Sequence, residues 1–328
     1  MRFPIRPFDH VPHVDFMRMR TFWIWSSVVM VLLTFGVLGY RGLNYGIDFV
    51  GGKLVEIQTA KALSVADVRE TVDAAGFAGA VIQQYGADNV YLLRLPGNIP
   101  AAQKSGAEAG VVAGLQQKAG GAELRRVEFV GPQVGQELRV KGLLAMLLST
   151  AAILVYVWIR FEFRYGLGAI LALGHDVILT IGIACLLRTE VTLTVLAAVL
   201  TLIGYSLNET IVIFDRVRDN RRRYPNRPLR EVINLSVNQT LGRTIMTGGS
   251  VLLVLCSLFL WGGEAVHDFS RVLLIGVALG TYSSIFVSSS ALLALEEFYQ
   301  KMAREAALPA KPEKPADKTV VKAAKKAK

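Results

Sequence analysis

Four residues that can carry a charge lie inside apolar stretches long enough to cross a membrane. His175 and Asp176 are adjacent in LALGHDVILTIG, Glu209 lies in GYSLNETIVIFDR, and Arg243 lies in NQTLGRTIMTGG. A charge in hydrocarbon is costly and usually serves a function. Because an isolated carboxylate there tends to neutralise by taking up a proton, these residues predict a site that binds and releases protons.

Glu209 and Arg243 are expected to meet inside the membrane. Glu209 lies about six residues, or roughly 9 Å, before the polar boundary at Asp215. Arg243 lies about as deep if its helix enters the membrane near Val237. In antiparallel neighbouring helices the two side chains would then face each other. Such a pair is either part of a proton path or a static ion pair that fixes helix register, and the lipid setting favours the proton path.

Three further polar residues are candidates for the same path. Tyr205 lies one helical turn before the acid of the fourth span, and Gln239 lies one turn before the arginine of the fifth, so each shares a helix face with a charge. Their positions fit a proton relay and interhelical hydrogen bonding equally well. Asp176 is the third candidate, because a carboxylate in mid-membrane needs a partner inside the bundle. His175 points in another direction around the helix and fits a hydrogen-bonding role.

These residues require membrane-spanning helices to position them. Hydrophobic residues make up 52% of the 328 residues, and the mean hydropathy is +0.42, which indicates an integral membrane protein. A spanning helix needs about 20 apolar residues, and lipid permits no open-ended backbone except a helix. The sequence therefore predicts a bundle of six transmembrane helices, at about 21–39, 142–159, 166–187, 191–213, 244–262 and 272–294.

The short loops give the orientation. Arginines gather before the first span, between the second and third, and after the fourth, and such loops face the cytoplasm. This predicts a multi-pass protein of the bacterial inner membrane with both termini in the cytoplasm. The expected division is a cytoplasmic arm 1–20, span 21–39, a periplasmic insert 40–140, a five-helix region 141–295 with a cytoplasmic loop 214–243, and a Lys-rich cytoplasmic tail 296–328, disordered after about 308.

The basic tail and the net charge of +10 indicate attraction to anionic lipids of the inner leaflet. This reading is favoured over nucleic-acid binding, because basic segments beside a membrane bind its anionic surface. The sequence therefore predicts membrane lipids, and no nucleic acid, as partners of this charge.

The insert alternates strand-like and helix-like patterns. Strands are expected at 52–58, 80–85, 89–95 and 123–130. Helices are expected at 64–76, with Ser64 as its N-cap, and at about 101–119. The order β-α-β-β-α-β is that of a ferredoxin-like α+β domain. A domain of about 100 residues can hold such a core by itself.

Glycine-rich segments flank the insert on both sides. GIDFVGG sets the Asp48 carboxylate between glycines that permit turns other residues cannot make. We expect Asp48 to pin this junction through backbone N–H groups rather than to titrate. The segment before the second span is expected to form a matching hinge. The junction residues are Gly46, Asp48, Gly51, Gly52, Gly131, Pro132 and Gly135.

Gly276 and Gly280 form a GxxxG pattern in the last span, which permits close helix contact within the chain or with a partner subunit. Cys185 and Cys256 lie within predicted spans and are expected to pack in the core. The sequence has no phosphate-binding Walker loop, no nucleophile beside a base and no Cys/His metal cluster. It therefore predicts no metal site, no cofactor and no enzyme activity.

Five segments in order resemble the SecF family of the bacterial protein-export complex. They are GIDFVGG, VEFVGPQVGQEL, GHDVILTIG, GYSLNETIVIFDRVRDN and LSVNQTLGRT. The resemblance implies a fold similar to that of the resistance-nodulation-division transporters, with half of the spans in each subunit. It also implies that the family position of Glu209 is usually an aspartate.

The resemblance implies a subunit that acts with SecD and uses the proton motive force to help export proteins through the SecYEG channel. YajC, YidC and the exported polypeptide are further implied partners. A small-molecule proton antiporter of the resistance-nodulation-division type is an alternative, although an insert of about 100 residues is short for the large porter domains of that class. A second alternative is an assembly scaffold in which the intramembrane charges only set helix register.

Overall fold

The computed structural model describes residues 13–95, 107–161 and 163–307. Within these ranges six helices are long and apolar enough to cross a membrane, so the chain is a multi-pass membrane protein. The spanning segments are α1 (Arg20–Arg41), α5 (Pro132–Arg160), α6 (Phe163–Leu186), α7 (Leu193–Arg223), α8 (Leu229–Trp261) and a last helix made of α9 (Glu264–Ser283), a π-helical turn (Ser284–Ser288) and α10 (Ser289–Ala307).

Several helices extend beyond the apolar stretches. The segment 214–243, which was expected to be a loop, is helical except at residues 224–228 between α7 and α8. The apolar stripe continues through this charged region, where Val217, Ile233 and Val237 are buried. Hydropathy alone ends a span at the first charges, but a helix continues as long as one face can pack. The chain also stays helical through residue 307, into the predicted tail, although residues 300–305 are exposed, while residues 308–328 lie outside the described residues.

Three helices form the centre of the bundle. Half or more of the apolar window is buried in α6, α7 and the α9–α10 segment, against 11–17% in α1, α5 and α8. Ala198, Leu202 and Val277 are among the buried residues where α7 meets α9. The central helices therefore hold the residues that are shielded from lipid, and the outer helices present most of their apolar surface outward.

The chain between α1 and α5 forms an α+β domain after a short helix α2 (Ile47–Val50). Its elements are β1 (Gly52–Thr59), α3 (Val65–Ala74), β2 (Val81–Tyr85), β3 (Ala87–Leu95), α4 (Ala107–Ala119) and β4 (Ala122–Val130), which is the order that the sequence predicts. The strands pair antiparallel in the order β2-β3-β1-β4. The start of the predicted second helix, 101–106, lies outside the described residues.

Alternation along the strands gives the domain its own core. Val55 and Ile57 of β1 point toward α3 and α4 and pack with Val68 and Leu115. Ser64 caps α3, as predicted, by accepting a hydrogen bond from the Asp67 N–H at 3.1 Å. Within the described ranges, α3 and α4 both lie on the face of the sheet that Val55 and Ile57 line, and no helix of the domain packs with the core from the opposite face.

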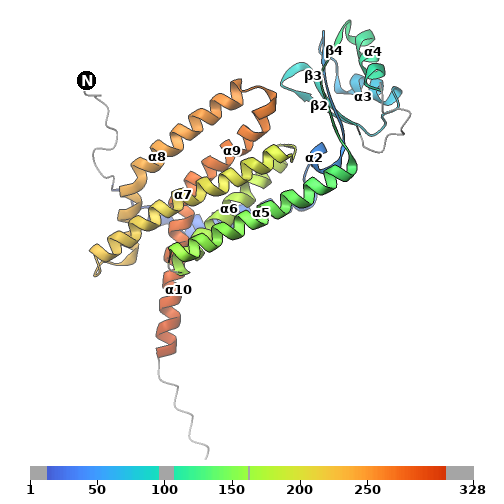
Figure 1. Ribbon diagram of the computed structural model, residues 1–328. Helices are drawn as coiled ribbons and strands as arrows, with labels where there is room; N and C mark the ends of the chain where they lie inside the picture. The colour runs from blue at the N-terminus through green and yellow to red at the C-terminus, as the bar shows by residue number, and fades with distance from the viewer. Residues whose placement is uncertain (1–12, 96–106, 162, 308–328) are drawn as a thin grey trace, which may run out of the picture.

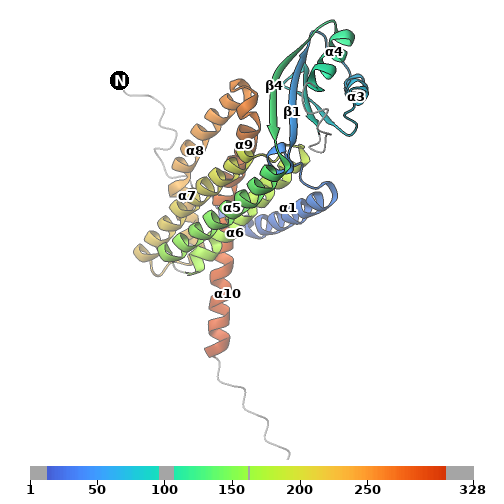
Figure 2. The ribbon, with the colours of Figure 1, turned by 45° about the vertical axis from the view of Figure 1, so that its right-hand side comes forward.

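The domain lies at one end of the bundle, and the connections between α5 and α6 and between α7 and α8 lie at the other (Figure 1). We call these two connections the arginine-rich turns, because Arg160, Arg164, Arg221, Arg222 and Arg223 lie at the helix ends that they join. The α7–α8 turn and α10 extend away from the domain, whereas the α8–α9 turn lies toward it, and Figure 2 shows the same arrangement from another side. The segment before α1 docks on α8, where Asn238 Oδ1 accepts from the Val14 N–H at 2.9 Å and Asn234 Oδ1 accepts from the Phe16 N–H at 2.8 Å. The N-terminal segment and the arginine-rich turns therefore share one end.

Candidate functional site

Glu209 lies near the middle of α7 and is 1% exposed. Neither oxygen of its carboxylate has a hydrogen-bond partner among the described residues. A buried carboxylate without a partner is costly when ionised and much less costly when protonated. The fold thus places an acid without a partner in the lipid-shielded centre of the bundle.

Arg243 does not form the expected ion pair with Glu209. It is exposed on α8 and forms no ion pair with any residue in the described ranges. Ile245 and Met246 beside it are also exposed, at 44% and 65%. The expectation assumed that both side chains face the α7–α8 contact, but the rotation of α8 turns Arg243 outward. That rotation depends on tertiary packing and cannot be read from spacing.

The two polar neighbours of these charges contact different helices. The Tyr205 hydroxyl lies 3.1 Å from Thr281 Oγ1 of α9, and Tyr205 precedes Glu209 by one turn of α7. Gln239 Oε1 instead accepts hydrogen bonds from Arg216 Nε at 2.7 Å and from Asn220 Nδ2 at 2.8 Å. Tyr205 therefore stays near the acid, whereas Gln239 joins α8 to the end of α7 that is remote from the domain.

Asp176 is fully buried between α6 and α7. Its Oδ2 accepts a hydrogen bond from Ser206 Oγ of α7 at 2.6 Å, and its Oδ1 lies 2.9 Å from Nδ1 of the adjacent His175. His175 and Asp176 therefore do interact, although neighbouring residues point in different directions along an ideal helix. Ser206 precedes Glu209 by three residues, so this polar group adjoins the unpaired acid.

A third buried acid of the bundle was not among the candidates. Glu296 of α10 is 2% exposed and accepts from Arg164 of α6 at 2.7 Å and from Arg221 of α7 at 2.9 Å. These bonds tie three helices together at the arginine-rich end. The acidic pair inside LLALEEFYQ was the only sequence signal for this site. Its two cations are 132 and 75 residues away, so no local pattern could assign them.

The segment 41–48 is bound to the turn 187–192 between α6 and α7. The Gly46 N–H donates to the Val191 carbonyl and the Val191 N–H donates to the Asn44 carbonyl, both at 2.8 Å. Asp48 Oδ2 accepts from the Leu193 N–H at 2.9 Å, at the start of α7. A Cβ on Gly46 would lie 2.8 Å from a methyl carbon of Thr192. We refer to these contacts, together with those of Arg94 described below, as the domain junction.

The other glycines of the flanking segments allow close approach or unusual turns. Gly51 and Gly52 have φ of 75° and 137°, which side chains rarely adopt. Pro132 opens α5 after Gly131, and a Cβ on Gly135 would lie 2.9 Å from the Gly51 nitrogen. The two glycine segments thus contact each other, which restricts bending at the segment expected to be a hinge.

Gly276 and Gly280 of α9 both face α7 of the same chain. A Cβ on Gly276 would lie 2.7 Å from a methyl carbon of Leu202, and a Cβ on Gly280 would lie 3.3 Å from Ser206 Cβ. The absence of side chains lets α9 approach the part of α7 that carries Ser206 and Glu209. The GxxxG pattern, for which contact within the chain and with a partner were both open, thus packs inside the chain.

A salt bridge between Arg94 of β3 and Glu190 of the α6–α7 turn joins the sheet to the bundle. The two side chains are 13% and 11% exposed, and Arg94 Nη1 also donates to Asn44 Oδ1 at 3.2 Å. Burial raises the pKa of the Glu190 carboxyl and outweighs Arg94, which lowers it, while Asp268 and Asp48 raise it further. This contact completes the domain junction.

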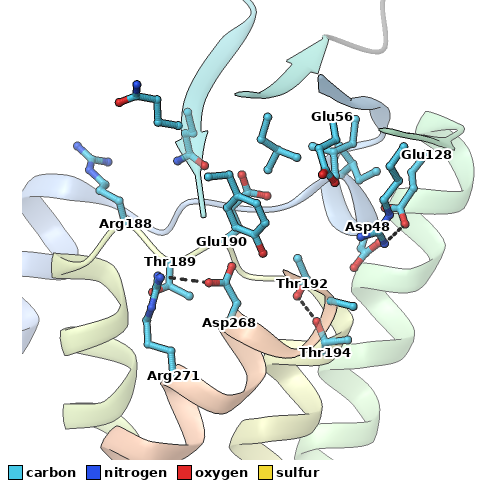
Figure 3. A pocket seen from close by; sticks show the side chains of 18 of the residues that line it. Asp48, Glu56, Glu128, Arg188, Thr189, Glu190, Thr192, Thr194, Asp268 and Arg271 are labelled. Carbon is cyan, nitrogen blue, oxygen red and sulfur yellow. Dashed lines mark hydrogen bonds and ion pairs between the residues drawn. The ribbon is translucent and has the colours of Figure 1, made fainter. Parts of the chain in front are cut away.

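A cavity of about 570 Å³ lies beside this salt bridge, between the uncovered face of the sheet and the ends of α7 and α9. Figure 3 shows Glu56, Glu128 and Asp48 on the domain side and Glu190 and Asp268 on the bundle side, all lining the same space. No group of three or more His, Cys, Asp or Glu residues suited to a metal ion occurs in the described part of the chain.

Comparison with protein families finds two matching models. Residues 111–298 match the model for the protein export membrane protein SecD/SecF, C-terminal, and residues 37–62 match the SecD/SecF GG motif. The second match covers the junction segment around Asp48. The first covers more than half of the chain and includes the helices that carry Asp176, Glu209 and Arg243.

Curated relatives and solved structures agree with these matches. The chain is 45% identical to protein translocase subunit SecF of Magnetococcus marinus, over 87% of this chain and 92% of the relative. It is 43% identical to the subunit of that name from Pseudomonas aeruginosa, over 85% and 90%. The crystal structure of SecDF, a translocon-associated membrane protein of Thermus thermophilus, superposes with a TM-score of 0.79 at 33% identity. That match covers 90% of this chain and 40% of SecDF, so the chain spans less than half of that protein.

Proposed function

The chain belongs to the SecF family of protein translocase subunits, and from that premise we propose that it acts with a SecD subunit to drive protein export with the proton motive force. The observation that carries this proposal is Glu209, a carboxylate 1% exposed whose oxygens have no partner among the described residues. A transported proton needs a group that can hold it in the low-dielectric interior. Glu209 is such a group.

The outward position of Arg243 supports the presence of a partner subunit beside α8. A lipid-exposed arginine in the middle of a spanning helix is costly, and its cost falls when another protein supplies a counter-charge. Since α8 presents Arg243 outward among exposed apolar side chains, this face of α8 is suited to a helix of SecD that carries a carboxylate. The match of this chain to 40% of SecDF supports the same arrangement, because the remainder of that chain is available to cover this face.

We propose a ferredoxin-like class for the α+β domain, which its element order and its β2-β3-β1-β4 antiparallel sheet support. We also propose that the arginine-rich end of the bundle faces the cytoplasm and the domain faces the periplasm of a bacterial inner membrane, which the bias of arginine toward cytoplasmic loops supports. We propose that the domain contacts the exported polypeptide. The SecYEG channel, YajC and YidC are the further partners that family membership favours, and membrane lipids surround the bundle.

The proposed cycle follows from the electrostatics of Glu209. A proton that enters from the periplasm neutralises the buried carboxylate, which removes the cost of a charge in the centre of the bundle. The helices can then shift between two packings, and the contact of Arg243 with the partner subunit shifts with α8. Loss of the proton to the cytoplasm restores the charge and the first packing. The fixed domain junction transmits such a shift of α6 and α7 to the periplasmic domain.

The proposal is tested by export into inverted membrane vesicles that contain the assembled complex. Glu209→Gln mimics the protonated acid and should export at the rate that the unchanged protein shows after the gradient is collapsed. Glu209→Asp keeps the acid and should retain most of the gradient dependence. Arg243→Leu should lose that dependence, and Arg243→Lys should keep part of it because it keeps the charge without the planar fork.

Co-purification with SecD serves as the assembly control for every variant. If Glu209→Gln and Arg243→Leu both export with unchanged gradient dependence, the proton path is wrong and the chain is an assembly scaffold. If no SecD-like protein accompanies the tagged chain from mild detergent, the partnership is wrong.

A further inference from the structure

The bundle contains two kinds of buried acid that differ in their partners. Glu296 is 2% exposed and binds two arginines, so its charge is balanced. Asp176 is 0% exposed, and among the described residues no arginine or lysine pairs with it, its ion-pair partner being the imidazole of His175. An unbalanced carboxylate in such a place is stable only if it can share or take up a proton.

The groups that face Asp176 come from three helices. His175 belongs to its own helix, and α7 contributes Ser206, with Tyr205 and Glu209 on the adjoining turn. From α9 the Ser283 hydroxyl lies near the same carboxylate, without a hydrogen bond to it. His175 is therefore the only titratable side chain in direct contact with Asp176 among the described residues, and Glu209 is the nearest acid along α7.

Two buried polar atoms around Asp176 are without a hydrogen-bond partner among the described residues. They are Nε2 of His175, on a residue 6% exposed, and Oγ of Ser283, on a residue 0% exposed. A cluster that served only to join helices would satisfy its buried polar groups. The helix that supplies Ser283 continues directly into the π-helical turn Ser284–Ser288, a departure from α-helix that is frequent at functional sites.

The order of the two acids along the bundle fits a path from the domain end. Asp176 lies ten residues, or about 15 Å, from the end of α6 nearest the domain. Ser206 binds it, and Glu209 follows Ser206 by three residues, or about 4.5 Å, toward the arginine-rich end. Because residues three apart share a helix face, Ser206, which donates to Asp176, and Glu209, whose oxygens have no partner among the described residues, lie on one face of α7.

We infer that Asp176, with His175, forms a second proton-binding site of the bundle, which a proton coming from the domain side occupies before it reaches Glu209. The Ser206 hydroxyl, which donates to Asp176 in this packing, links the two sites when it turns to donate its own proton to Glu209 as it receives one from Asp176. One proton moves in this exchange, and Asp176 returns to the carboxylate form. The inference rests on the proposed proton-driven function and adds a second site to it.

Labelling with dicyclohexylcarbodiimide tests the inference in membranes that contain the full chain and its partner. This apolar reagent forms a stable adduct with protonated carboxyl groups in a membrane, and mass spectrometry of peptides locates the adduct. We expect adducts on Asp176 and on Glu209 that decrease as the pH rises. Glu296 is the matched control, since it is equally buried but held ionised by two arginines, and it should not react.

The pattern of labelling separates the two proposals. Adducts on Glu209 without any on Asp176 overturn the second site and leave the proposed function standing. No adduct on either acid removes support from both. Labelling of Glu296 to the same extent would show that the reagent does not report protonation here, and the decision then passes to the activity of the variants.

Variants of Asp176 and Ser206 test whether this cluster helps to couple the proton gradient to export. Asp176→Asn preserves the size of the side chain and one acceptor oxygen but cannot titrate, and it should reduce gradient-dependent export by about tenfold, whereas Asp176→Glu should restore part of it. Ser206→Ala should lower the rate more than Ser288→Ala, which removes a buried hydroxyl bonded only to a backbone carbonyl. Full gradient-dependent export by assembled Asp176→Asn would show that the cluster only joins helices and would overturn the inference.

Discussion

Replacing Arg94 by Met should loosen the domain junction, because it leaves Glu190 buried without its cation. The two side chains are 13% and 11% exposed, and removing one partner of a buried pair typically costs about 3–5 kcal/mol. In this variant the unpaired Glu190 carboxylate can avoid this cost by taking up a proton. From an ordinary pKa of 4.5, protonation at pH 7 costs at most about 3 kcal/mol at 1.36 kcal/mol per pH unit. We therefore expect the junction to open on the order of 100-fold more often.

Cys185 provides the assay. Its thiol is 3% exposed and donates to the Gly42 carbonyl at 3.0 Å, inside the junction. Cys256 is exposed and is first replaced by Ala. When closing is fast relative to labelling, the rate of thiol modification is proportional to the fraction of open junctions. Arg94→Met should raise that rate about 100-fold at pH 7, and by less in acid, where Glu190 protonates without the variant.

Two controls decide whether the reasoning holds. Arg126→Met removes the cation of an ion pair with Glu128 on the same domain, whose side chains are 46% and 39% exposed. Exposed pairs contribute less than about 1 kcal/mol, so the rate should change by less than about fivefold. Replacing Arg94 and Glu190 together by Met should return the rate close to that of the unchanged protein. An Arg94→Met rate within fivefold of the starting value, or an equal effect of Arg126→Met, would refute the argument.

Three other changes have defined outcomes. Gly182→Ala should destabilise the bundle by about 1–3 kcal/mol, because the new methyl would overlap the Thr34 side chain of α1. The loss is measured as a lower melting temperature in detergent. Thr34→Ala in the same protein should recover part of the loss, and no recovery would show that the strain does not come from this contact. The raised pKa of Glu190 means that the closed junction binds a proton more tightly than the open one, so closure should weaken as the pH rises from the ordinary glutamate value through the raised one. Glu190→Gln should abolish this pH dependence of thiol labelling, and an unchanged dependence would assign it to another group. A cysteine at Ala87 should react with a membrane-impermeant reagent from the periplasm and one at Asn226 only from the cytoplasm; periplasmic labelling of Asn226 would reverse the proposed orientation.

Much of the fold could be predicted because its signals are local. Hydropathy located the six spans, and alternation located the four strands, with β1 and β4 starting within one residue of their predicted positions. The family resemblance, carried by five short segments, is confirmed by the comparisons. The charged part of the α7–α8 hairpin was expected to be a loop, but it is helical. Hydropathy detects segments that are apolar throughout, and it does not detect a buried apolar stripe on a charged helix, such as that formed by Val217, Ile233 and Val237.

The contacts of the candidate site were harder to predict, since they join residues far apart in the chain. Composition identified Glu209, Arg243 and Asp176 as costly groups, but their partners depend on how each helix is rotated. Arg243 shows this clearly, because a modest rotation of α8 decides between an ion pair and the outward position that it occupies. The Arg94–Glu190 bridge gave no sequence signal, since each residue lies in a segment whose local pattern is ordinary.

Proton movement through the complex tests the central claim most directly. Vesicles that contain the purified chain with SecD, an internal pH dye and an export substrate held at the channel are given a proton gradient. The account predicts a substrate-dependent proton flux that Glu209→Gln reduces to the rate of vesicles without the complex and that Glu209→Asp largely preserves. A Glu209→Gln complex that conducts protons as fast as the unchanged one would contradict the claim that this carboxylate carries the proton.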